Sequence, residues 1–72
     1  MKTFNQMIHQ VLGNRSLMLH EIYSEYINLR LELGMDMVSH ETMARMIRND
    51  SSIETVPFIT ASGKKLFKRR IK

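Results

Sequence analysis

The chain has 72 residues, a formal net charge of +4 at pH 7 and no cysteine. This length allows one small domain, residues 1–72, with a core of limited size. The lack of cysteine excludes disulfides and cysteine-based zinc sites. The longest wholly apolar runs, such as residues 17–19, are far shorter than the roughly 20 residues needed to span a bilayer. Nothing resembles a signal peptide, so we expect a cytoplasmic protein without a membrane segment.

The positive charge is concentrated near the C-terminal end. Six of the eleven Lys and Arg residues lie within the last nine positions: Lys64, Lys65, Lys68, Arg69, Arg70 and Lys72. A basic cluster favours a polyanionic partner, and nucleic acid is the commonest one. The alternative interpretation is a tail that only keeps the protein in solution.

Apolar spacing predicts a first helix that begins after Thr3 and ends at Gly13. Its apolar residues recur at intervals of three and four, as on one face of a helix: Phe4, Met7, Ile8, Val11 and Leu12. Thr3 is a suitable N-cap, and Gly13 can adopt the left-handed conformation that ends a helix. We expect the polar side of this helix, including His9, to face solvent.

Residues 14–19 form a connector with two interpretations. Either Ser16 caps the next helix, or Leu17 and Leu19 point inward from a short extended segment. A second helix is predicted over about residues 20–33, ended by Gly34. Its apolar face comprises Leu19, Ile22, Tyr23, Tyr26, Ile27 and Leu33. Arg30 also falls on this side, so we expect its stem to pack and its charged head to reach water.

Residues 35–38 then form a short turn before a third helix, residues 39–49. Ser39 is its N-cap, and Glu41 in the first turn suits the positive end of the helix dipole. Its buried side is a narrow seam of Met43, Met46 and Ile47. The opposite side carries Glu41, Thr42, Arg45, Arg48 and Asn49. A helix, a glycine, a short turn and a capped helix together give the layout of a helix-turn-helix.

The remaining residues predict a β-hairpin. Ile53–Ile59 is rich in β-branched and aromatic residues, and Pro57 within it indicates an edge strand or a bent end. Residues 60–64 form a turn in which Gly63 supplies a positive φ. Residues 66–71 are the returning strand. The tip of the hairpin therefore carries Lys64 and Lys65.

Taken together, the chain resembles a winged helix-turn-helix domain. The stretch GMDMVSHETMARMIRND corresponds to the turn and recognition helix, and ASGKK corresponds to the wing tip. The resemblance covers a support helix at 3–12, the helix-turn-helix at 20–49 and the wing at 53–71. It implies an α+β fold, in which a three-helix core is followed by a C-terminal β-hairpin wing. In that family the third helix typically reads the major groove, while the wing reaches a minor groove or the backbone.

The resemblance implies sequence-specific binding of double-stranded DNA by a small transcriptional regulator, which would then be associated with the nucleoid. Candidates for base contacts lie in the first half of the recognition helix: Ser39, His40, Thr42 and Arg45. Arg45 is the preferred one, because a guanidinium can pair with guanine through two hydrogen bonds. Arg48 and Asn49 are expected to contact phosphate. The basic wing, residues 60–70, would add electrostatic attraction through Lys64, Lys65, Lys68, Arg69 and Arg70.

Three further features concern the placement of charge relative to DNA. About half of the strand positions between residues 66 and 72 must face the interior, so not all of these cations can reach one DNA backbone. Glu41 lies on the presumed DNA side, where it could accept from cytosine or repel phosphate. The exposed side of the second helix is acidic and is expected to stay away from DNA: Glu21, Glu25 and Glu32.

Other functions have weaker support in the sequence. His9, His20 and His40 lie on separate elements without metal-ligand spacing, and no phosphate-binding glycine loop is present. We therefore expect no enzyme activity, metal site or cofactor. The main alternative is a winged-helix module, an antirepressor or adaptor, that binds a protein partner or a second copy of the chain. If exposed together, four apolar residues that the pattern does not assign to the core would form its contact surface: Met18, Leu31, Met35 and Met37. RNA binding is a third alternative.

Overall fold

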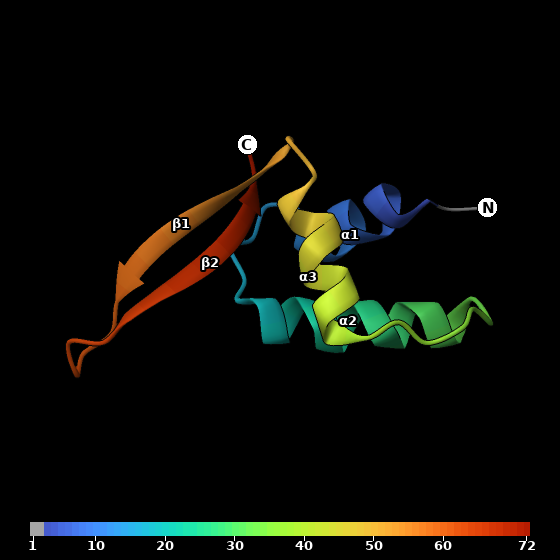
Figure 1. Cartoon of the computed structure of the whole chain (residues 1–72), viewed down its shortest axis with the longest axis horizontal. Coiled ribbons are helices and arrows are strands. Elements are labelled where there is room, and N and C mark those ends of the chain that lie inside the picture. The colour runs from blue at the N-terminus through green and yellow to red at the C-terminus, as the bar shows by residue number, and fades with distance from the viewer. Residues whose placement is uncertain (1–2) are drawn as a thin grey trace.

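The structure is a computed structural model that describes residues 3–72. Its elements, in chain order, are α1 (Phe4–Leu12), α2 (Leu19–Glu32), α3 (His40–Arg48), β1 (Ile53–Ile59) and β2 (Lys65–Ile71). The helices pack together, and the antiparallel β1–β2 hairpin projects from them (Figure 1). This projection contributes to a longest dimension of 41 Å. The predicted α+β class is confirmed, and the layout is compatible with a winged helix.

Local capping contacts explain why the helices start where they do. The Thr3 hydroxyl accepts from the Gln6 backbone N–H, and the Gln6 side chain accepts from the Thr3 N–H. The Ser39 hydroxyl accepts from the Thr42 N–H at 3.1 Å, as the sequence predicted. Gly13 follows α1 with a φ of 52°, a conformation that is costly for residues with a Cβ. These caps satisfy backbone groups that helix ends leave unpaired.

The structure decides between the two interpretations of the connector before α2. Leu17 is buried and extended, whereas Leu19 is already the first residue of the helix. Ser16 does not cap α2. Instead the Met18 N–H, at the N-cap position, donates to the Glu21 carboxylate at 2.9 Å. The extended interpretation is therefore right for Leu17 and wrong for Leu19. The helix can begin at Leu19 without a serine cap, because the Glu21 carboxylate accepts from the backbone N–H at the N-cap position.

One apolar core joins all three helices to the base of the hairpin. Its members are Met7, Ile8, Val11, Leu12, Leu17, Ile22, Tyr26, Met43, Ile47 and Ile53. Two predicted core residues are exposed, namely Leu33 at 48% and Met46 at 38%. Leu33 lies one residue beyond α2, where the chain leaves the helix axis. Met46 stays outside the core because only Met43 and Ile47 of α3 are buried.

The hairpin is attached to the helices through its base. Leu17 N–H donates to the Arg69 carbonyl at 3.0 Å, and Arg69 N–H donates to the Leu17 carbonyl at 2.7 Å. β2 therefore pairs with β1 on one side and with Leu17 on the other, which leaves β1 at an edge. Pro57 in β1 suits that edge, as predicted, since it has no N–H to donate. The tip turns at Gly63 with a φ of 87°.

A polar cluster links α1 to the turn before β1. The Asp50 carboxylate, whose side chain is only 6% exposed, accepts from the Ser52 N–H at 2.9 Å and the Ser52 hydroxyl at 2.6 Å. His9 Nε2 lies 2.9 Å from the same hydroxyl oxygen and 3.6 Å from Asp50. The hydroxyl proton points to Asp50, so Nε2 must be the donor to Ser52. The expectation that His9 only faces solvent is therefore wrong, because the turn before β1 folds back onto α1.

This cluster makes stability depend on pH. The hydrogen bonds from Ser52, with the nearby His9, lower the pKa of Asp50 from its ordinary value. A lowered pKa stabilises the fold above about pH 4, and this contribution is lost as the pH falls further. We expect Asp50→Asn to lower the free energy of unfolding at pH 7 by about 1 kcal/mol, since hydrogen bonds to a charged acceptor are stronger. The difference from wild type should shrink towards about pH 3.

Urea denaturation across this pH range would measure the effect. Asp36→Asn is the matched control, because it removes the same charge from an exposed side chain. A wild-type to Asp50→Asn difference that stays constant with pH would contradict the assigned role of the Asp50 charge.

Candidate nucleic-acid interface

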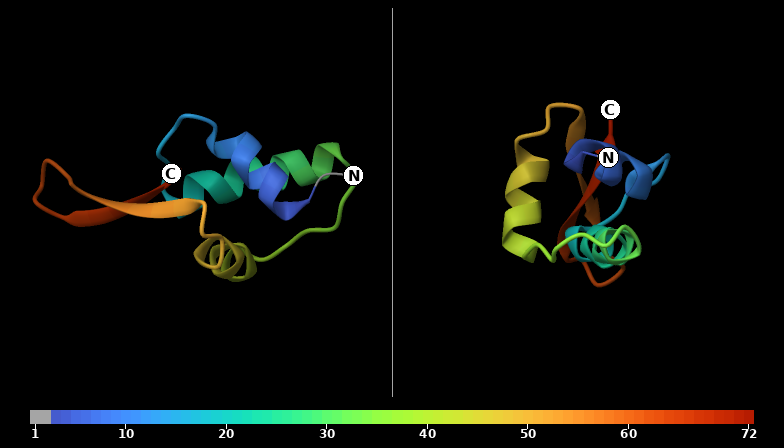
Figure 2. Two further views of the ribbon diagram at one scale, coloured as in Figure 1. Left: turned by 90° about the horizontal axis from the view of Figure 1, so that it is seen from above. Right: turned by 90° about the vertical axis from the view of Figure 1, so that its right-hand side faces the viewer.

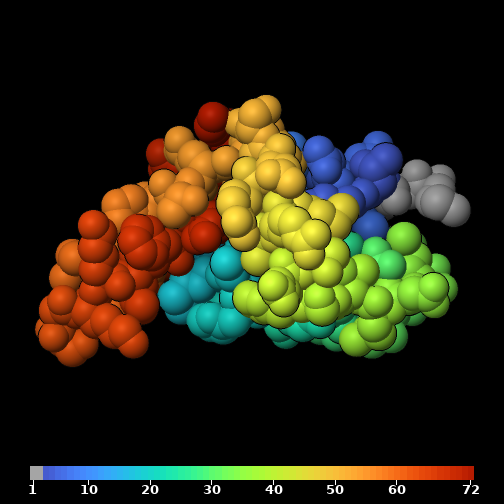
Figure 3. All heavy atoms as spheres, viewed as in Figure 1, coloured from blue at the N-terminus to red at the C-terminus, as the bar shows by residue number. Residues whose placement is uncertain are grey.

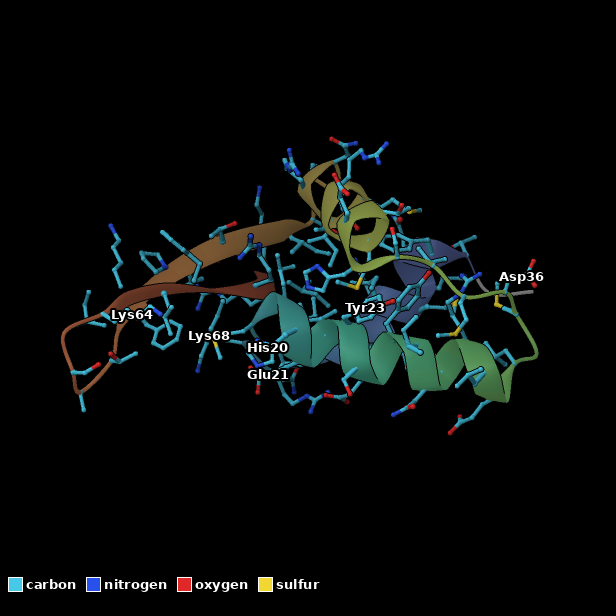
Figure 4. All side chains as sticks on the ribbon, turned by 60° about the horizontal axis from the view of Figure 1, so that its bottom comes forward. His20, Glu21, Tyr23, Asp36, Lys64 and Lys68 are labelled. Carbon is cyan, nitrogen blue, oxygen red and sulfur yellow. The ribbon has the colours of Figure 1, made fainter. Side chains whose placement is uncertain are left out.

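Side chains of α2 hold the turn that leads into α3. The Tyr23 hydroxyl donates to the Val38 carbonyl at 2.7 Å, directly before the Ser39 cap (Figure 4). Arg30 donates from Nε to the Asp36 carbonyl and from Nη1 to the Tyr26 hydroxyl at 2.9 Å. We expected the Arg30 head to reach water and did not expect it to bond to the turn. Instead Tyr23 and Arg30 fix the path of the turn and thereby the position of α3.

The apolar pattern of α2 did not predict that these two residues bond to the turn. The available signal was a hydroxyl and a guanidinium on the otherwise apolar side of α2. Polar groups in that position need partners when they are partly buried, and the carbonyls of an irregular turn can supply them.

The predicted site residues of α3 divide into two groups. The Ser39 hydroxyl donates to Thr42 Oγ1 at 2.9 Å and accepts from its N–H, so both side chains are used in the cap. The His40 ring packs edge-on against Tyr23, with 5.2 Å between ring centroids. The outer surface of α3 is instead formed by exposed polar side chains: Glu41, Arg45, Arg48 and Asn49. The unpaired charge available for a partner therefore comes mainly from the arginines.

A hollow of about 320 Å³ lies between α3 and the hairpin. Its lining comprises Leu19, Ala44, Ile47, Arg48, Ile53, Thr55 and Arg69. Two arginines, one from α3 and one from β2, thus meet over an apolar floor with no acidic residue in the lining. Burial, and then the charge of Arg48, lower the pKa of Arg69. The guanidinium still remains protonated at neutral pH.

Some basic side chains away from this hollow are paired with carboxylates. Among residues 3–72 the ion pairs are Arg15–Glu25 at 2.7 Å, Arg70–Glu54 at 2.6 Å and His9–Asp50 at 3.6 Å. None of them includes Arg48 or Arg69. The two guanidinium groups repel each other, and no acidic side chain in the lining offsets this repulsion. Binding of an anion between them is therefore favourable.

The hairpin divides the predicted wing cations between two faces. Side chains of directly paired residues share a face, and faces alternate along each strand. Because Thr55 and Arg69 are paired and line the hollow, their face turns towards α3 and also carries Lys65 and Phe67. We call it the α3-side face. Lys68 and Arg70 lie on the opposite face, so the cations of β2 do not all share one surface.

Lys64 belongs to neither strand. It lies in the turn at the far end of the hairpin, whereas Lys68 lies nearer to the helices (Figure 4).

The acidic side of α2 lies away from the arginine hollow, since Glu25 and Glu32 line the groove between α1 and α2. Figures 2 and 3 show α3 and the hairpin exposed on one side of the molecule. The structure thus brings Arg48 and Arg69 together and leaves Lys68 and Arg70 apart from them.

Comparisons with protein families, curated proteins and solved structures give no match to this chain. Within residues 3–72, no three His, Cys, Asp or Glu side chains gather in a way that could hold a metal ion. The same part of the chain contains no helix with the length and apolar character required to cross a membrane.

The cap of α3 can be tested separately from any partner. Ser39→Ala should lower the free energy of unfolding by about 1 kcal/mol, because the Thr42 N–H loses its acceptor. Ser39→Asp should retain wild-type stability, since aspartate caps as well as serine. Far-UV circular dichroism during urea denaturation would measure both. Ser24→Ala, at an exposed position within α2, is the control and should change stability by less than about 0.5 kcal/mol. Equal losses for both alanine variants would contradict the capping role.

Proposed function

We propose that the protein is a winged-helix regulator that binds double-stranded DNA in a sequence-specific manner. The observation that carries this proposal is the pair Arg48 and Arg69, held between α3 and the hairpin with no acidic residue lining their hollow. Such a pair fits a phosphate group, which offers several acceptor oxygens to guanidinium donors.

The order of the three features matches the order of features along a duplex. A major groove, about 12 Å wide, accepts an α-helix, and a phosphate backbone separates it from the adjacent minor groove. With α3 in the major groove, the backbone would pass over Arg48 and Arg69. The hairpin beyond them would then lie at the minor groove. Helix, arginine pair and hairpin therefore correspond to major groove, backbone and minor groove.

Within this arrangement the residues have different roles. Arg45 lies on the exposed side of α3 and is the candidate for reading guanine through its O6 and N7 atoms. Asn49, at the end of α3, and Lys65, at the start of β2, would add phosphate contacts. Glu41 lies on the same exposed side of α3. Its carboxylate could accept a hydrogen bond from a cytosine amino group and would repel a phosphate. Three other residues would help DNA binding only indirectly, by holding α3 in place: Ser39, His40 and Thr42.

A second candidate function is supported by an apolar surface at the other end of the molecule. Leu31, Leu33 and Met37 are all exposed where α2 leads into the turn before α3. Figure 1 shows this turn at the opposite end of the long axis from the tip of the hairpin. A surface of this kind would suit a protein partner or a second copy of the chain. It is compatible with DNA binding, because it leaves the α3 side open.

The salt dependence of DNA binding tests the proposed interface. Fluorescence anisotropy with a random duplex should show affinity falling as salt rises from about 50 to 200 mM, because bound phosphates release counterions. Each phosphate contact contributes roughly −0.9 to the slope of log affinity against log salt. Arg48→Ala/Arg69→Ala should therefore flatten the slope by roughly one to two units. Arg45→Ala should instead weaken the preference for a selected site.

The control variant Arg15→Ala/Arg70→Ala removes the same net charge. Its two arginines are paired with Glu25 and Glu54, and both line a different hollow, away from α3. This variant should keep the wild-type slope. If both double variants changed the slope equally, net charge alone would explain binding, and the assigned interface would be wrong. An absence of duplex binding at about 100 mM salt would favour the protein-binding function.

A further inference from the structure

The α3-side face of the hairpin exposes large apolar side chains as well as cations. Ile59 is 65% exposed and Phe67 is 48% exposed, and the exposed Pro57 is paired with Phe67. Lys65 Nζ lies 5.8 Å from the centre of the Phe67 ring. Because the hairpin projects from the helices, these side chains have no core to enter. They extend the surface that begins at the arginine pair.

The opposite face of the same hairpin is built differently. Val56, Phe58 and Leu66 are half-buried there, and Lys68 covers the Phe58 ring with its Nζ at 4.8 Å from the ring centre. The only acidic residue of either strand, Glu54, also belongs to this face and is paired with Arg70. The hairpin therefore shields one apolar face and exposes the other, and the exposed one carries only positive charge. That combination is complementary to a partner that is anionic outside and apolar within.

We infer that Phe67 and Ile59 insert between base pairs from the minor groove and bend the duplex. This inference rests on the proposed DNA binding and adds the mode of recognition by the hairpin. Proteins that bend DNA from the minor groove combine cations with apolar wedges of Phe, Ile or Pro, which unstack a base step. Lys65 and Arg69 stand two positions on either side of Phe67 along β2, so they can contact phosphates while the ring enters the stack.

The wedge also gives a sequence preference without hydrogen bonds to bases. Pyrimidine–purine steps such as TA unstack more easily than the steps of a stiff A-tract. A site with a TA step beneath the hairpin should therefore bind more tightly than a site with an A-tract there. Replacing Phe67 by alanine should remove this preference.

Energy transfer between dyes at the two ends of a duplex measures the bend directly. A fluorescent adenine analogue placed at a central TA step reports unstacking. Wild-type protein should bend the duplex by roughly 20–90° and raise the fluorescence of the analogue. Phe67→Ala should lose both signals, while its affinity, measured by anisotropy, stays within about tenfold of wild type because unstacking no longer opposes binding. Phe67→Leu should restore the bend, since leucine also serves as a wedge.

Phe58→Ala is the matched control, because it makes the same change on the shielded face and should retain the bend. Circular dichroism would establish that each variant folds. If Phe58→Ala does not fold, Phe67→Leu still serves as the comparison for Phe67→Ala. Duplex binding by wild type without a bend or unstacking would overturn the inference but leave the proposed function intact. Binding to anionic lipid vesicles that requires Phe67, without any duplex binding, would overturn both and assign this face to a lipid surface.

Discussion

The pair of backbone hydrogen bonds between Leu17 and Arg69 is the contact on which the proposed DNA-binding surface depends. An isolated two-stranded hairpin is marginally stable in water, so its strands need a further partner. The connector before α2 supplies that partner for β2, while Ile53 at the start of β1 enters the core. The same pairing sets the side of β2 that faces α3. The arginine hollow and the two different faces of the hairpin follow from this choice.

The second constraint is the path of the chain between α2 and α3. Few apolar residues of α3 are buried, so packing alone leaves its orientation weakly defined. Tyr23 and Arg30 compensate by donating to carbonyls of the turn, and Ser39 then starts the helix at a fixed point. Contacts far from the outer surface of α3 thus determine where Arg45 and Arg48 lie. A helix with so thin a buried seam depends on this kind of support.

The distribution of charge is the main support for the proposed function. Arg15 and Arg70, two arginines away from the α3 side, are paired with the carboxylates of Glu25 and Glu54. Arg48 and Arg69 both line the hollow at the junction of helix and hairpin, and neither belongs to an ion pair among residues 3–72. Such an arrangement has an electrostatic cost in the free protein and a gain when an anion binds between the two groups. The exposed apolar face of the hairpin continues this surface, so one side of the molecule combines electrostatic and apolar contacts.

The sequence by itself determined the elements, because caps, apolar periodicity and turn residues act over a few positions. Thr3, Gly13, Ser39 and Gly63 mark boundaries that the structure confirms. Only the tertiary structure decided which cations lie beside α3, why Leu33 and Met46 stay exposed, and that His9 bonds to Ser52. Alternation along a strand defines two faces but does not say which one meets α3. That choice depends on Leu17 pairing with Arg69, a contact between residues far apart in the chain that no local pattern encodes.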